Sequence, residues 1–180
     1  MAAPVYYTAD MVRALPEDGN RYDVVYGELL VTPAPRVWHQ IIQNRLLIAL
    51  HEYLLREPVG HVMSSRSDLS WRPDLLVSPD LFVAPLEEIR TLDWAQVQDL
   101  RLVVEILSPS SVRYDRFTKR RLFQDRGVPV YWVVDGDAHQ VEVWAPDASF
   151  PTVVRDELRW HAAPARSPFT LDLAELFLPL

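Results

Sequence analysis

The sequence contains no cysteine, only five glycines and a single lysine among its 18 basic residues. The absence of cysteine excludes disulfides and thiolate metal sites, so a bound metal would need carboxylate, carbonyl or imidazole ligands, which favours a hard cation. With five glycines against 15 prolines, there is neither a flexible glycine-rich linker nor a phosphate loop of the Walker kind. We therefore expect short, stiff connections between the secondary-structure elements.

A long apolar run is also missing. No segment approaches the ~20 consecutive apolar residues needed to span a bilayer, and Met1–Asp10 lacks the basic stretch and apolar core of a secretion signal. We therefore expect a cytoplasmic protein without a membrane anchor. The 180 residues, 49% hydrophobic and 24% charged, indicate one globular domain over residues 1–180.

Positive charge is scarce overall but concentrated in one segment. The formal net charge of −7 is a poor match to a nucleic-acid partner, because lysine and arginine supply most of the non-specific affinity for phosphates. Between Arg113 and Arg126, however, six basic residues stand against two acidic ones, a local charge of +4. Local charge matters more than net charge for such contacts, and the acidic excess lies elsewhere in the chain.

The spacing of apolar residues predicts both helices and strands in the first half of the chain. Tyr22–Thr32 alternates well enough to form a β-hairpin that turns near Gly27. Val37–Arg56 has apolar residues at helical spacing and predicts one long amphipathic helix. The following segments predict strands over His61–Ser70 and Ser78–Ala84, a turn at Arg72–Asp74, and a loop with a short helix over Leu86–Leu100.

A strand, a helix and a second strand are predicted in the centre of the chain. Arg101–Leu107 is a nearly continuous apolar run of the kind found in a buried strand, and Val130–Val134 is another. Between them, Asp115 can cap a helix that runs to about Arg126, with Gly127 just after its end. This order predicts a crossover with parallel strands. The rest of the chain predicts an antiparallel hairpin strand over Gln140–Trp144 and a short closing helix within Leu171–Leu178.

Two carboxylates stand out as candidate metal ligands. Glu105 lies inside an apolar strand, where an ionised carboxylate costs several kcal/mol unless it is paired or bound to metal. Asp80 follows Pro79 at the start of another apolar run. Carboxylates from adjacent strands and a main-chain carbonyl can hold a hard cation. The alternatives are an ion pair between Glu105 and an arginine and a simple turn at Asp80, and Asp74 in Pro73–Leu75 is a rival ligand.

Lys119 is the only lysine, whereas the other 17 basic residues are arginines. An ammonium group near a reactive phosphate can position a water molecule and neutralise developing charge, a task that arginine performs less well. A helix with ~100° per residue would place Lys119 on the face that also carries Asp115, Leu122 and Phe123 and that turns toward the sheet. The alternative is that Lys119 is a surface residue without a function, retained by chance.

These residues lie within segments that are similar to one known family. The segments are Tyr22–Glu28, Pro33–Pro35, His39–Gln40, Pro79–Leu81, Val103–Asp115, Lys119 and Gly127–Asp135. Together they resemble the restriction endonuclease family often called Uma-two, within the PD-(D/E)xK nuclease superfamily. The resemblance covers about residues 20–145. The sequence departs from the family pattern at Val130 and Tyr26, where acidic residues are common.

The resemblance implies an α/β fold of the restriction-endonuclease-like class, a mixed β-sheet flanked by helices with an N-terminal β-hairpin and a C-terminal β-hairpin extension. It implies that Asp80, Glu105 and the main-chain carbonyl of Ile106 bind Mg²⁺ or Mn²⁺. The usual lysine two residues after the glutamate is replaced by Leu107, and the resemblance implies that Lys119 takes its place. Three further residues are candidate accessory groups: Glu28, His39 and Asp115.

The leading functional hypothesis is a metal-dependent endonuclease that hydrolyses phosphodiester bonds in DNA. Asp80 and Glu105 would bind the metal and Lys119 would assist the attack of water. A homodimer would present paired sites to the two strands of a duplex. The alternative is a catalytically idle nuclease fold that binds nucleic acid or a protein partner, and a toxin-like module from a mobile element is a third hypothesis. The endonuclease hypothesis requires the three side chains to converge.

Overall fold

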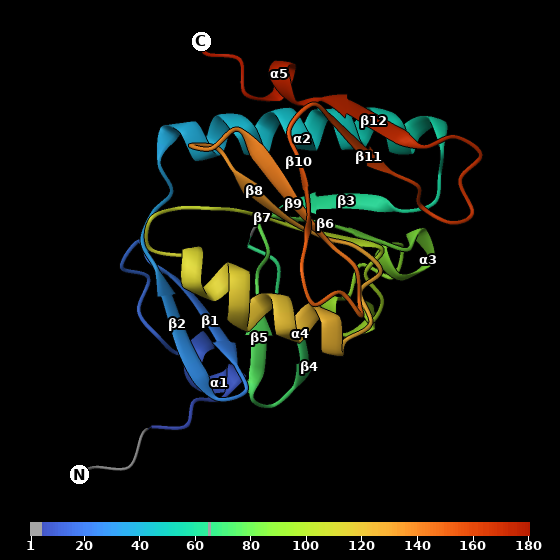
Figure 1. Cartoon of the computed structure of the whole chain (residues 1–180). Coiled ribbons are helices and arrows are strands. Elements are labelled where there is room, and N and C mark those ends of the chain that lie inside the picture. Colours follow the sequence, from blue (N-terminus) through green and yellow to red (C-terminus); the bar gives the residue numbers. More distant parts are fainter. Residues whose placement is uncertain (1–4, 65) are drawn as a thin grey trace.

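The computed structural model describes residues 5–64 and 66–180, and its centre is a sheet with the strand order β10-β9-β8-β7-β6-β3 (Figure 1). These strands are β3 (His61–Ser64), β6 (Leu81–Ala84), β7 (Leu102–Ile106), β8 (Tyr131–Asp135), β9 (Gln140–Trp144) and β10 (Thr152–Val154). Strands β7 and β8 are parallel, whereas the other neighbours are antiparallel. The predicted mixed sheet, its parallel crossover and the β8–β9 hairpin are thus confirmed.

Two smaller sheets accompany the central one. The first has the order β2-β1-β5-β4 and the second pairs β11 with β12. Their strands are β1 (Arg21–Val25), β2 (Glu28–Thr32), β4 (Leu69–Arg72), β5 (Leu75–Val77), β11 (Glu157–Trp160) and β12 (Phe169–Asp172). The register from Val25 opposite Glu28 confirms the predicted hairpin and its turn, where Gly27 has a φ of +81°.

The helices lie on both faces of the central sheet (Figure 1). They are α1 (Ala9–Arg13), α2 (Val37–Arg56), α3 (Leu86–Ile89), η1 (Trp94–Gln96), η2 (Tyr114–Lys119), α4 (Arg120–Asp125) and α5 (Leu173–Leu176). The long helix α2 has the predicted bounds and shares one face with β11, β12 and α5, whereas α4 and the first small sheet lie on the other. Within the described residues, no helix combines the length and hydropathy that crossing a bilayer requires.

The alternation of side chains along β7 determines where Glu105 points. Val104 and Ile106 pack into the core that includes α2, whereas Val103 packs into the core that includes Leu122 and Phe123 of α4. Because successive side chains of a strand point to opposite faces, Glu105 lies on the same face as Val103. The strand therefore directs Glu105 toward the helix that carries Lys119.

The predicted strand over His61–Ser70 is wrong, because the structure splits this segment between two sheets. Strand β3 joins the central sheet and β4 joins the first small sheet. Between them, Arg66 has a φ of +72°, a backbone conformation that no strand tolerates. Residue 65 lies outside the described residues, as do residues 1–4 of the segment considered for a secretion signal.

Several other boundaries also differ from the prediction. The strand expected over Ser78–Ala84 begins only at Leu81, so Asp80 lies in the connection between β5 and β6. Asp115 does not cap its helix, because the helical segment begins at Val112 and the Asp115 amide donates to the carbonyl of Ser111. The closing helix is only four residues long. The residues of β10, β11 and β12 were not predicted as strands, although β11 and β12 form an antiparallel pair near the C-terminus, where the resemblance implies a hairpin extension.

Candidate active site

Asp80, Glu105 and Lys119 converge between β6, β7 and η2. The Lys119 ammonium nitrogen lies 2.9 Å from Glu105 Oε1, and the Asp80 amide donates to Glu105 Oε2 at 3.3 Å. All three residues are buried, with exposed fractions of 2%, 0% and 1% respectively. Lys119 thus lies on the inner face of its helix, as its spacing predicted, and not on the surface.

Strand β1 adds two residues that the sequence did not single out. Asp23 Oδ2 lies 2.9 Å from the Lys119 ammonium nitrogen, and Arg21 Nη1 donates to Asp80 Oδ1 at 2.7 Å. The buried Asp23 follows the same rule as Glu105, because it is a carboxylate next to apolar strand residues, and that rule could have identified it. Arg21 gave no such signal, since it is one of 17 arginines.

Helix α2 holds Asp80 from the opposite side. His39 Nε2 lies 3.0 Å from Asp80 Oδ2, and Gln43 Nε2 donates to the Asp80 carbonyl at 2.9 Å. These two residues are four apart and share one helix face. The Ile106 amide donates to Asp80 Oδ2 at 2.8 Å. His39 is thus brought into the site, whereas the part expected of Ile106, through its carbonyl, stays a prediction.

Asp115 joins the cluster, whereas Glu28 and Asp74 lie elsewhere. Asp115 is buried with Oδ1 3.5 Å from the Lys119 ammonium nitrogen. Glu28 is exposed at the start of β2. Asp74 accepts hydrogen bonds from Tyr6 at 2.6 Å and Arg72 at 3.0 Å. Neither Glu28 nor Asp74 lines the pocket that the described residues form at Asp80.

The environment of Asp74 predicts a pH-dependent contribution to stability. The Tyr6 hydrogen bond and the Arg72 charge lower the pKa of the Asp74 carboxyl below its usual value. A lowered folded-state pKa stabilises the protein at neutral pH. This stabilisation is lost as the pH falls from the usual aspartate value near ~4 down through the lowered pKa of the folded state. We expect Asp74→Asn to cost about 1–2 kcal/mol of unfolding free energy at pH 7.

Thermal denaturation followed by circular dichroism at pH 7 and at about pH 3 measures this effect. The difference in Tm between wild type and Asp74→Asn should shrink at the lower pH. The exposed Asp99 provides the control, because Asp99→Asn removes a surface carboxylate without these contacts. Equal Tm differences at both pH values would contradict the assignment of Asp74 to this contact.

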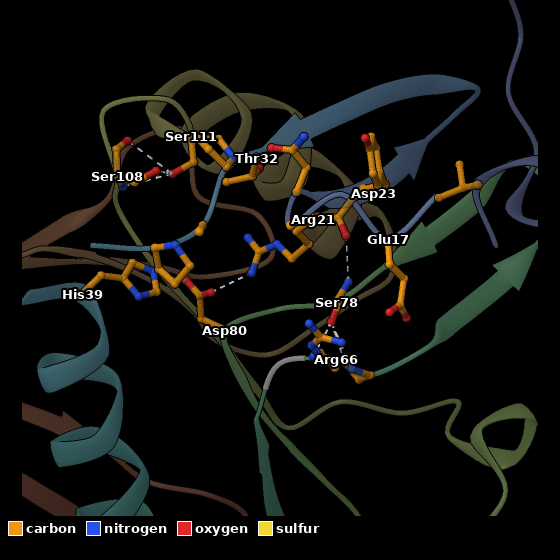
Figure 2. Close-up of a pocket in the computed structure, with 18 of the residues that line it drawn as sticks. Glu17, Arg21, Asp23, Thr32, His39, Arg66, Ser78, Asp80, Ser108 and Ser111 are labelled. Carbon is orange, nitrogen blue, oxygen red and sulfur yellow. Dashed lines mark hydrogen bonds and ion pairs between the residues drawn. The ribbon is translucent and has the colours of Figure 1, made fainter. Parts of the chain in front are cut away.

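A pocket of about 660 Å³ with a mixed polar and apolar lining opens onto the cluster (Figure 2). Figure 2 shows the Arg21 guanidinium pointing toward Asp80, with His39 on the other side of this carboxylate. The polar side chains that line the pocket include Arg21, Asp23, His39, Asp80, Ser108 and Ser111. The two serines belong to the loop that follows β7, so the pocket lies at the carboxyl end of this strand. Such a pocket gives a ligand access to Asp80.

The buried cluster contains more carboxyl groups than cationic groups. Four carboxyl groups surround two permanent cations; the groups are Asp23, Asp80, Glu105, Asp115, Arg21 and Lys119. Burial raises the pKa of Glu105 well above its usual value despite the nearby Lys119. At Asp80, burial also opposes ionisation, but the His39 hydrogen bond and the Arg21 charge lower the pKa below its usual value. An additional cation at the cluster would favour the ionised form of Glu105.

The residues at the pocket fit a hard divalent cation. The Arg21 guanidinium already forms ion pairs with Asp80 and Glu105, so one cationic group contacts both carboxylates. Within the described residues, no three histidine or acidic side chains are arranged to hold a metal. The two carboxylates of Asp80 and Glu105 alone would suit Mg²⁺, which binds few carboxylates and keeps several waters.

Comparison with known proteins places this geometry in a family. The Uma2 model, described as "Putative restriction endonuclease", matches residues 9–173. No curated protein matches the chain. A solved structure, described as "a putative nuclease belonging to DUF820 from Anabaena variabilis", aligns with a TM-score of 0.76 and 19% identity over 95% of this chain and 97% of that chain, which shows a common fold. Because the family model spans most of the sequence, the chain belongs to the Uma2 restriction endonuclease family.

Proposed function

We propose that this protein is a Mg²⁺- or Mn²⁺-dependent endonuclease that hydrolyses phosphodiester bonds in DNA. The observation that carries this proposal is the cluster of buried carboxyl groups at one pocket, with Asp80 in the pocket lining and Glu105 and Lys119 beneath it. A bound divalent ion would polarise a phosphate oxygen and lower the pKa of a water molecule. The family and the nuclease fold are consistent with this chemistry.

Each residue of the cluster has a distinct part in this proposal. Asp80, Glu105 and the Ile106 carbonyl would hold the ion, and His39 would orient Asp80 through its 3.0 Å contact. Lys119 would assist the attack of water by fixing Glu105 and neutralising its charge, since its ammonium group contacts Glu105 at 2.9 Å. We assign Asp115 an accessory part, because it lies beside the same ammonium group.

Basic side chains near the pocket support DNA as the substrate. Arg113 and Arg121 are exposed on the helical segment that begins next to the pocket residue Ser111. Arg116, in contrast, is paired with Glu142 at 2.8 Å and is less available for phosphates.

We also propose a homodimer, because two copies of the site could cut both strands of a duplex. Light scattering coupled to size-exclusion chromatography measures the oligomeric state.

A plasmid-cleavage assay tests the proposal. Wild-type protein is expected to nick or linearise supercoiled plasmid with Mg²⁺ or Mn²⁺ and to be inert with EDTA. Asp80→Asn should lower cleavage by about 100-fold or more, because it removes one of the two carboxylates that would hold the ion. Asp99→Asn serves as the control, since this exposed residue lies outside the pocket. Cleavage by wild type in EDTA would contradict the proposal.

One observation favours an idle nuclease fold as the second candidate. Asp80 and Glu105 each already have a basic partner, Arg21 and Lys119 respectively, so the cluster is partly neutralised without a metal. An idle fold would bind nucleic acid or a protein partner and leave plasmid intact with every metal. A gel-shift of duplex DNA without cleavage in Mg²⁺ and Mn²⁺ would favour this alternative over the endonuclease.

A further inference from the structure

The guanidinium of Arg21 lies where the proposed metal ligands face each other. Its Nη1 donates to Asp80 Oδ1 at 2.7 Å, and its Nη2 lies 3.9 Å from Glu105 Oε2. In the part of the chain that the structure describes, no other basic side chain forms ion pairs with both of these carboxylates. A cation bound to both Asp80 and Glu105 would therefore compete with Arg21 for these two carboxylates.

Arg21 is held less firmly than the other cation of the cluster. The Arg21 side chain is 25% exposed and lines the pocket, and its buried Nε has no hydrogen-bond partner among the described residues. The Lys119 side chain, in contrast, is 2% exposed, and its ammonium nitrogen lies 2.9 Å from both Asp23 and Glu105. Turning the Arg21 side chain into the pocket would break one short hydrogen bond and one long ion pair.

Simple electrostatics opposes the simultaneous presence of both cations. A guanidinium and a divalent ion that share the same carboxylate oxygens would lie within a few ångströms of each other, in a buried environment where like charges repel strongly. Arg21 is one of two permanent cations among four carboxyl groups, and loss of the Arg21 charge would make the cluster more negative. The affinity for a divalent cation should therefore depend on where Arg21 points.

We propose that Arg21 is a built-in competitor of the divalent cation, which leaves the two carboxylates when the metal binds and turns into the pocket to bind the DNA phosphate. This inference rests on the proposed function, because it takes Asp80 and Glu105 as the metal ligands. A guanidinium presents several donors in a plane that match two phosphate oxygens. Displacement would thus couple metal binding to substrate binding through one side chain.

Calorimetric titration of the DNA-free protein with Mn²⁺ tests the competition directly. Arg21→Met keeps an unbranched apolar stem and removes the charged guanidinium, so we expect Mn²⁺ to bind about tenfold or more tightly than to wild type. Arg66→Met is the matched control, because exposed Arg66 lines the same pocket without an ion pair to either carboxylate. It should change the Kd by less than about twofold. Unchanged or weaker binding to Arg21→Met would overturn the inference.

A measurement on wild type covers the case in which Arg21→Met does not fold. Nitrogen-15 NMR of the arginine Nε–H groups, with the Arg21 signal assigned from Arg21→Lys, should show this signal moving as Mg²⁺ is added while that of Arg66 stays. A stationary Arg21 signal at saturating Mg²⁺ would overturn the inference. Neither experiment needs DNA cleavage, so a protein that binds metal in competition with Arg21 but leaves plasmid intact would refute only the nuclease proposal.

Discussion

Glu105→Gln is expected to lower metal-dependent plasmid cleavage by about 100- to 1000-fold while the protein stays folded. Glutamine has the size of glutamate but carries no charge, so the substitution removes a proposed metal ligand without leaving a cavity. Burial already raises the pKa of Glu105 well above its usual value. The neutral side chain is therefore expected to be tolerated, and the Tm of the metal-free variant should equal or exceed that of wild type.

The separation of activity from stability makes this variant informative. Initial cleavage rates in Mg²⁺ and a thermal melt in EDTA are the two measurements. Glu87→Gln is the matched control, because exposed Glu87 on α3 lies outside the pocket and should leave both quantities unchanged. Full cleavage activity in folded Glu105→Gln would show that Glu105 has no part in catalysis, although it lies next to Asp80 and Lys119.

Lys119→Met is expected to cause the largest loss of stability, about 3–5 kcal/mol of unfolding free energy. The Lys119 ammonium group is the shared partner of three carboxylates, at 2.9 Å from Asp23, 2.9 Å from Glu105 and 3.5 Å from Asp115. Without it, buried negative charges face one another without compensation. In a chain of this size each kcal/mol corresponds to ~2–4 °C in Tm, so we expect a decrease of about 10 °C or more.

Chemical denaturation measures the coupling energy between Lys119 and Glu105. The four proteins compared are wild type, Lys119→Met, Glu105→Gln and the double variant. The double variant should recover part of the loss, because it removes one of the unpaired charges together with the lysine. Arg121→Met on the exposed side of the same helical segment is the control and should change stability by less than about 0.5 kcal/mol. A Lys119→Met midpoint equal to that of wild type would show that the ammonium group does not stabilise the cluster.

The parts of the fold that the sequence predicted well have strong local patterns. Val37–Arg56 has apolar side chains along one face over its 20 residues, and the structure reproduces these bounds. The apolar runs that became β7 and β8 needed no partner to be recognised as buried strands. In contrast, β10 and β11 have three and four residues, too few for a period to appear, and their pairing depends on distant partners.

The residues of the candidate site likewise differ in how well the sequence predicted them. Glu105 was identified from the sequence because a carboxylate in an apolar strand needs compensation, and Lys119 because it is the only lysine. Asp23 obeys the same physical rule, because it is a buried carboxylate next to apolar residues of β1. Asp115 was expected to cap the helix and also to be an accessory group; the structure rejects the cap and places its buried side chain near Lys119. Glu28 could not be excluded from the site until the structure placed it on the exposed end of β2.

The sequence by itself determined that a buried carboxylate at Glu105 must be compensated, because removing a charge from water is costly wherever the strand lies. Only the tertiary structure decided which groups compensate it. Arg21 and Glu105 are 84 positions apart in the chain and meet because the sheet containing β1 packs beside the central sheet. Such a meeting depends on long-range packing and not on local spacing, and no pattern within β1 or β7 encodes it.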